Sequence, residues 1–262
     1  MLNLRIISSF AMLSLFLVFY FLLEPVFFQG LILVIGGLLL FELSKLLKLN
    51  GLFLGIYWFF SALFIFLYFT SNINYKLFSY LSLFFWFFFV PIDLYLRALL
   101  PNVVKIFYGL LFITPLLISV DHLFHFDKLF LLILITMIWV ADIGAYFFGK
   151  KFGAIKLVKN ISPGKTLEGV YGAVISNSLF SFLLYHFLDL DLINTLIIAC
   201  MVTLLSIYGD IYESLLKRKV NIKDSGNLIP GHGGFLDRMD GFCSTLPIIN
   251  FVCLVFPSLK II

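Results

Sequence analysis

The chain has 262 residues, of which 62% are hydrophobic and only 12% are charged, and 34 of them are phenylalanine. This composition excludes an ordinary soluble domain, and the long apolar runs do not alternate with polar residues as the strands of a membrane barrel do. The three cysteines have no metal-type or disulfide-type spacing. The sequence therefore predicts an all-α, polytopic helical membrane protein, and we expect no nucleic-acid partner.

Nine apolar runs are long enough to cross about 30 Å of hydrocarbon. The first follows Arg5 and lacks a small-x-small cleavage site, so we expect a retained transmembrane helix and not a signal peptide. Five spans fall in residues 1–128, and four fall in 129–262 together with two polar loops, 149–168 and 217–241. The predicted spans are 6–23, 26–43, 52–70, 77–96, 103–120, 129–148, 169–188, 192–208 and 242–259.

The distribution of basic residues predicts the orientation of these spans. With a cytoplasmic N-terminus, fifteen of the 18 Lys and Arg residues lie on the cytoplasmic face, as the positive-inside rule requires. We therefore expect the N-terminus and both polar loops in the cytoplasm of a bacterial-type inner membrane. Gly51 and Gly55 form a small-xxx-small pair, compatible with a helix contact, a homodimer or chance.

Two charged elements lie at or near the predicted cytoplasmic end of span six. Asp142 falls within an apolar run, where a carboxylate needs a cation or a lysine partner. In Ser162-Pro163-Gly164-Lys165-Thr166, we expect Ser162 to cap the next helix with Pro163 at its first position. Lys165 beside that helix end would form a phosphate clamp, the alternative being an ordinary capped helix with a solvated lysine.

The densest polar cluster begins at Gly209. Asp210, Glu213, Ser214 and Lys217 share one helical face. Further along, Asp237 and Asp240 are three residues apart and would also share a face. Three carboxylates form a hard-oxygen site suited to Mg²⁺, with a second cation as an option. Glycines and a histidine lie between them, at Gly231, His232, Gly233 and Gly234, where His232 could donate to a phosphate. The alternative is a solvated loop.

These residues resemble the signature of the phosphatidate cytidylyltransferases, the CDP-diacylglycerol synthases. Trp139, Asp142, Ala145 and Tyr146, and then the Ser162–Thr166 element, precede it in the order typical of that family. The matching signature residues are Ser214, Lys217, Arg218, Lys223, Asp224, Gly226, Ile229, Pro230, His232, Gly233, Gly234, Asp237, Arg238 and Asp240. Gly241 stands where serine is more usual.

The resemblance implies transfer of CMP from CTP to phosphatidic acid, giving CDP-diacylglycerol and pyrophosphate at the bilayer. Lys151 and Lys219 are interpreted as solvated. A CTP-dependent lipid-alcohol kinase or a CDP-archaeol-type synthase is an alternative enzyme, and an anion transporter is an alternative of another class. We expect catalytic roles for Asp210, Lys217, Arg218, Asp237 and Asp240, with Mg²⁺ on the three aspartates. We expect substrate contacts from Asp142, Ser162, Lys165, Thr166, Ser214, Lys223, Asp224, His232, Gly233, Gly234 and Arg238.

Overall fold

The computed structural model describes residues 20–21, 24–70, 74–229 and 233–259. Seven helical stretches in this part are long and apolar enough to cross a membrane. They are α2 (Pro25–Leu46), α3 (Gly51–Phe69), Tyr75–Leu96, Asn102–Phe126, α8 (Lys128–Phe152), α9 (Leu167–Leu188) and α10 (Leu192–Lys219). A shorter apolar helix, α11 (Asp240–Val255), follows. The prediction of an all-α polytopic membrane protein is confirmed.

The predicted count of nine spans is not confirmed. Seven of the predicted runs correspond to the seven long helices, and the run 242–259 corresponds to α11, which has only 16 residues. The run 6–23 lies almost wholly outside the described residues. Helix α10 also continues well past the predicted end at 208. The expected helical face from Asp210 to Lys217 therefore belongs to α10, and residues 217–219, which were predicted to open a polar loop, complete the same helix.

Two of the long stretches contain a π-helical turn just before a proline. In Tyr75–Leu96, α4 (Tyr75–Phe84) leads into Phe85–Phe89 and then α5 (Val90–Leu96), which contains Pro91. In Asn102–Phe126, α6 (Asn102–Ile106) and a turn at Gly109–Ile113 precede α7 (Thr114–Phe126) with Pro115. Proline lacks an N–H and clashes with the carbonyl four residues earlier, so a wider turn accommodates it.

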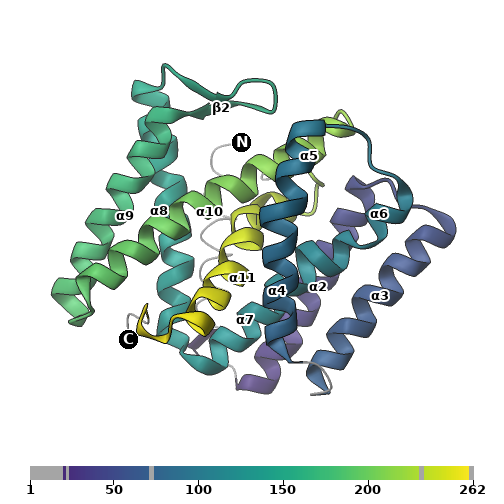
Figure 1. Cartoon of the computed structure of the whole chain (residues 1–262), viewed down its shortest axis with the longest axis horizontal. Coiled ribbons are helices and arrows are strands. Elements are labelled where there is room, and N and C mark those ends of the chain that lie inside the picture. Colours follow the sequence, from purple (N-terminus) through teal and green to yellow (C-terminus); the bar gives the residue numbers. More distant parts are fainter. Residues whose placement is uncertain (1–19, 22–23, 71–73, 230–232, 260–262) are drawn as a thin grey trace.

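Helices α8, α9 and α10 pack against one another, and α11 packs on α10, α7 and α4 (Figure 1). Close approach of α8 and α9 depends on Gly172, because a Cβ there would lie 2.3 Å from the Phe148 side chain. Asn177 donates to Thr203 at 2.7 Å and links α9 to α10 within the core. Helix α10 is thus held from both sides along its length.

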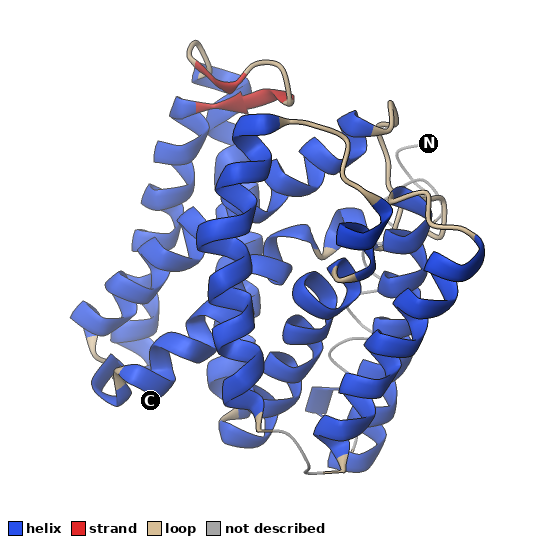
Figure 2. Cartoon of the chain, turned by 45° about the vertical axis from the view of Figure 1, so that its right-hand side comes forward, coloured by secondary structure: helices blue, strands red, loops and turns tan. Residues whose placement is uncertain are grey.

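A two-stranded antiparallel hairpin, β1 (Lys156–Val158) and β2 (Ser162–Thr166), connects α8 to α9. Figure 2 shows it at one end of the helical bundle, and Figure 1 shows the C-terminal end of α11 at the opposite end. The hairpin lies at the same end as the C-terminal part of α10, because Arg218 Nε of α10 donates to the Ile161 carbonyl at 3.2 Å. This end of the bundle holds the candidate site.

Candidate active site

Lys165 of β2 reaches α10 and forms an ion pair with Asp210. Its Nζ lies 2.5 Å from Asp210 Oδ2 and 3.3 Å from the Ile207 carbonyl. Ser214 Oγ, one turn further along α10, donates to Asp210 Oδ1 at 3.3 Å. Both ends of the ion pair are partly accessible, with 19% of the Lys165 side chain and 37% of the Asp210 side chain exposed. The pair joins the two segments that the sequence predicted as phosphate clamp and metal site.

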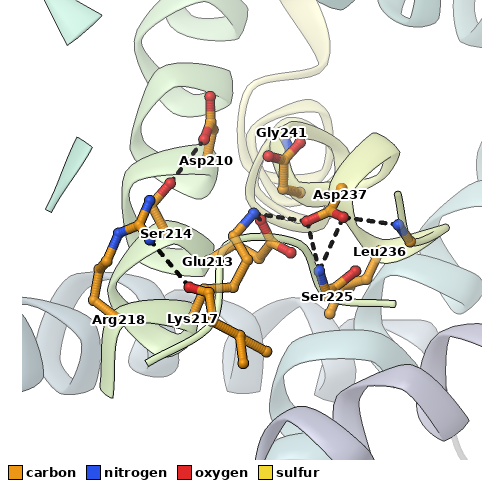
Figure 3. Close-up of polar contacts among 12 residues, drawn as sticks. Asp210, Glu213, Ser214, Lys217, Arg218, Ser225, Leu236, Asp237 and Gly241 are labelled. Carbon is orange, nitrogen blue, oxygen red and sulfur yellow. Dashed lines mark hydrogen bonds and ion pairs between the residues drawn. The ribbon is translucent and has the colours of Figure 1, made fainter. Parts of the chain in front are cut away.

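Lys217 lies between two carboxylates and is almost fully buried. Its Nζ is 2.5 Å from Glu213 Oε2, one helical turn earlier, and 2.7 Å from Asp237 Oδ1 (Figure 3). Glu213 has no exposed side-chain surface. A lysine buried with two acids is strongly tied to them, because each unpaired charge would be costly away from water. Lys217 therefore supports the site from within, and its removal would leave two acids without their cation.

Asp237 organises the loop that follows α10. Besides Lys217, its carboxylate accepts hydrogen bonds from the Ser225 N–H at 2.9 Å and the Gly234 N–H at 2.8 Å (Figure 3). Burial raises the pKa of Asp237, but the Lys217 ammonium and these two N–H groups outweigh it and hold the pKa below its usual range. Gly233 has φ of +87°, and a Cβ there would lie 2.8 Å from Asp237 Oδ2. The loop can close around this carboxylate only with glycine at that position.

The expected metal trio of Asp210, Asp237 and Asp240 is divided in this structure. Asp237 lies in a short 3₁₀ helix, Leu236–Arg238, whereas Asp240 is the first residue of α11, so the expectation that one helix aligns them is wrong. Asp240 instead interacts electrostatically with Asp210 and Asp142. No group of three or more potential ligands in the described part of the chain is arranged to hold a metal. Carboxylate oxygens are nevertheless the type of ligand that a hard cation such as Mg²⁺ prefers.

The interpretation of Ser162 as a helix cap is wrong. Residues Ser162–Thr166 form strand β2, with Thr166 paired to Lys156 of β1. Helix α9 begins at Leu167, and Thr166 caps it by accepting from the Gly169 N–H at 3.1 Å. Pro163 stands in the strand, where its missing N–H costs little at an exposed edge. Lys165 lies in this strand, two residues before α9 begins, and its side chain reaches Asp210 of α10.

Several of the remaining predicted residues lie around this cluster. Arg218 donates to the carbonyls of Ile161 and Ile222, so it ties the hairpin and the end of α10 together. The charges of Lys165 and Arg238 act on Asp142 of α8. Lys223 and Asp224 are exposed on the loop, Gly234 is buried in it, and His232 lies outside the described residues.

Two further acidic residues, from the first half of the chain, were missed by the sequence analysis. Asp93 of α5 forms an ion pair with Lys219 at the end of α10, and the hydroxyls of Tyr212 and Tyr108 also donate to it. The interpretation of Lys219 as solvated is therefore wrong, since only 7% of its side chain is exposed. Glu42 of α2 contacts the loop near Asp237. Both acids interrupt apolar spans, and that position was the available signal.

The chain is similar to several bacterial proteins named phosphatidate cytidylyltransferase. It is 38% identical to that of Haemophilus influenzae over 143 residues, covering 51% of this chain and 50% of the relative. It is 38% identical to that of Bacillus subtilis over 141 residues, covering 53% of this chain and 52% of the relative. For Pseudomonas aeruginosa the identity is 44% over 116 residues, or 43% of each chain.

These matches span about half the length of the relatives. The model of a whole family covers much more of the chain, because it matches residues 3–256. That match includes the hairpin, α10, the loop after it and α11, which together supply the cluster described above. The chain therefore belongs to the cytidylyltransferase family.

Proposed function

We propose that the protein is a phosphatidate cytidylyltransferase, a nucleotidyltransferase that transfers CMP from CTP to phosphatidic acid in the bilayer. The observation that carries the proposal is the Lys165–Asp210 ion pair. It brings the cationic hairpin against the acidic face of α10, at the accessible edge of a cluster rich in signature residues. The names of the bacterial relatives support the same reaction.

The reaction joins two anions, so charge neutralisation and alignment are its main requirements. A phosphate oxygen of phosphatidic acid attacks the α-phosphorus of CTP, and the bond from that phosphorus to the β-phosphate bridging oxygen breaks to release pyrophosphate. The attacking phosphate is already ionised at neutral pH, so no strong general base is needed. Lysine and arginine side chains at the site hold the phosphates in line.

Lys165 has the position for this role. In the structure its charge is matched by Asp210, and a triphosphate offers a stronger partner in a partly accessible place. Lys165 thus exchanges the carboxylate for phosphate oxygens when the nucleotide binds. Asp210 loses its cation in that exchange and becomes available, with Asp142 and Asp240 near it.

We propose Mg²⁺ at these acidic residues, where it would neutralise charge on the triphosphate. Asp142, Asp210 and Asp240 interact electrostatically, and carboxylates that repel one another are stabilised by a cation. Asp237 is assigned to the loop and to Lys217 and not to the metal. The Asp210→Asn and Asp240→Asn enzymes should therefore need more Mg²⁺ for half-maximal rate, whereas Asp237→Asn should lower protein stability. An unchanged Mg²⁺ dependence in the first two would overturn the assignment.

The deciding experiment uses purified protein with labelled CTP, phosphatidic acid and Mg²⁺. A lipid-extractable product that carries the cytidine label supports the proposal. Phosphorylation of a lipid alcohol from labelled γ-phosphate would indicate the kinase instead, and transfer only to an ether lipid would indicate a CDP-archaeol-type synthase.

We also propose that the site faces the cytoplasm and that the protein forms a homodimer. The first proposal rests on the distribution of basic residues. The second rests on Gly51 and Gly55, because a Cβ built at either position would meet no described atom within 4 Å.

A further inference from the structure

A single carboxylate in the apolar helix α2 contacts the loop after α10. Glu42 is only 2% exposed. Its Oε2 accepts from the Leu236 N–H at 2.7 Å and from Ser225 Oγ at 3.3 Å. A charged group is costly in a membrane helix, and such groups occur there when a specific partner stabilises them. The partners of Glu42 belong to the loop that carries Asp237.

Two carboxylates hold this loop from different sides. Asp237 accepts the Ser225 N–H, and Glu42 accepts the Ser225 hydroxyl. Gly226 lies so close to Glu42 that a Cβ there would be 2.4 Å from Oε1. A Cβ at Gly234 would be 2.8 Å from Oε2. The loop backbone is therefore shaped around the Glu42 side chain.

We propose that Glu42 is a positioning residue of the active site, through which α2 holds two parts of the loop after α10, residues 225–226 and 234–237. Glu42 reaches no reacting group and acts through Ser225 and Leu236. Its hydrogen bonds place Asp237 against Lys217. The expected effect of Glu42 on turnover rests on the proposed function. Its effect on the ordering of the loop does not, because that can be measured without substrate.

The role of Glu42 as an acceptor distinguishes it from a metal ligand or a catalytic acid. Oε1 has no hydrogen-bond partner among the described residues, so an amide nitrogen in its place loses no bond. Glu42→Gln therefore keeps the acceptor for Leu236 and should retain kcat/KM within about threefold. Glu42→Ala removes it and should lower kcat/KM about tenfold or more. Ser44→Ala is the matched control, because the buried Ser44 hydroxyl donates to the Phe41 carbonyl of the same helix.

Hydrogen exchange measures the loop without any substrate. In Glu42→Ala the amides of Ser225 and Leu236 should exchange faster, whereas Glu42→Gln and Ser44→Ala should match the wild type. Equal exchange in Glu42→Ala and wild type would overturn the proposal. So would equal losses of activity in Glu42→Gln and Glu42→Ala. If wild-type protein made no CDP-lipid, the proposed function would fail while the exchange result still decided the role of Glu42.

A double-mutant cycle tests the contact directly. Gly226→Ala clashes with Glu42 Oε1, so its effect on loop exchange should be much smaller in a Glu42→Ala background. Gly234→Ala is the control, because its Cβ would also lie 2.0 Å from Ser225 Oγ and 2.7 Å from the Gly226 backbone nitrogen. Truncating Glu42 leaves those clashes in place. The proposed contact would be contradicted if Glu42→Ala reduced the effect on loop exchange equally for both glycine variants. It would also be contradicted if Glu42→Ala reduced the effect of neither variant.

Discussion

Replacement of Lys219 by methionine should destabilise the protein although Lys219 is one of several lysines near the end of α10. Its ammonium pairs with Asp93, and 7% of the Lys219 side chain and 3% of the Asp93 side chain are exposed. Removing one member of a buried ion pair typically costs ~3–5 kcal/mol, because the other charge stays buried without its partner. The hydroxyls of Tyr212 and Tyr108 lie 3.0 and 3.4 Å from Asp93 Oδ2 and still stabilise its carboxylate.

We therefore expect the lower end of that range for Lys219→Met, about 3 kcal/mol, or roughly 100-fold in the folding equilibrium. Unfolding can be followed in mixed detergent micelles by tryptophan fluorescence, to which the buried Trp86 contributes, since its ring centroid lies 5.7 Å from that of Tyr212. Asp93→Asn should destabilise as well, and the double variant should lose less than the two single variants combined.

Lys151 provides the control for this measurement, because it is exposed near the end of α8. Lys151→Met should leave the free energy of unfolding within about 0.5 kcal/mol of wild type. If Lys219→Met and Lys151→Met were equally stable, the buried pair would contribute nothing measurable and the reasoning would be refuted. Additive losses in the Asp93 and Lys219 double variant would refute the direct interaction.

Two further predictions concern the site and its side of the membrane. Lys165→Ala should lower kcat/KM more than tenfold with little change in the free energy of unfolding, because the partly exposed Lys165 ammonium binds a phosphate. Lys151→Ala should change neither quantity. Equal losses of kcat/KM in the two variants would contradict the division between site and surface. In a cysteine-free background, a cysteine placed at position 221 should react only with thiol reagents in the cytoplasm, and a cysteine placed at position 189 should react only with reagents added outside the cell. Labelling of position 221 from outside would overturn both the orientation and the proposed side of the site.

The helices could be predicted from the sequence because long apolar runs leave few other ways to satisfy the backbone in a membrane. The runs 129–148 and 169–188 match α8 and α9 closely, although α8 continues to Phe152. The length of α10 was underestimated because the apolar run ends at 208 and the polar residues from 217 onward resemble a loop in composition. In the structure their charges are satisfied by Lys165 and Asp237, which lie far away in the sequence. The local pattern of residues cannot predict a helix end that depends on partners so distant in the sequence.

Many residues of the candidate site could be predicted from the sequence, but the contacts between them could not. Lys165 and Asp210 were both identified, yet nothing in their spacing indicates an ion pair across 45 positions of sequence. Glu42 and Asp93 required a different approach, which treats every acid inside an apolar run as a residue in need of a partner. The partners themselves follow only from tertiary packing, because α5 must first lie beside the end of α10 and α2 beside the loop that follows it.

The division of the acidic residues into two groups has a consequence for how the site works. Asp237 is held by Lys217 and by the N–H groups of Ser225 and Gly234, so its charge is already matched in the absence of substrate. Lys165 forms an ion pair with Asp210, its charge also acts on Asp142 and Asp240, and the proposed nucleotide would compete for it. An acid held by a buried lysine and by backbone N–H groups stabilises a fold, whereas acids that face a partly exposed lysine remain available to a ligand. One group therefore maintains the shape of the loop, and the other is the group that responds to the triphosphate and its cation.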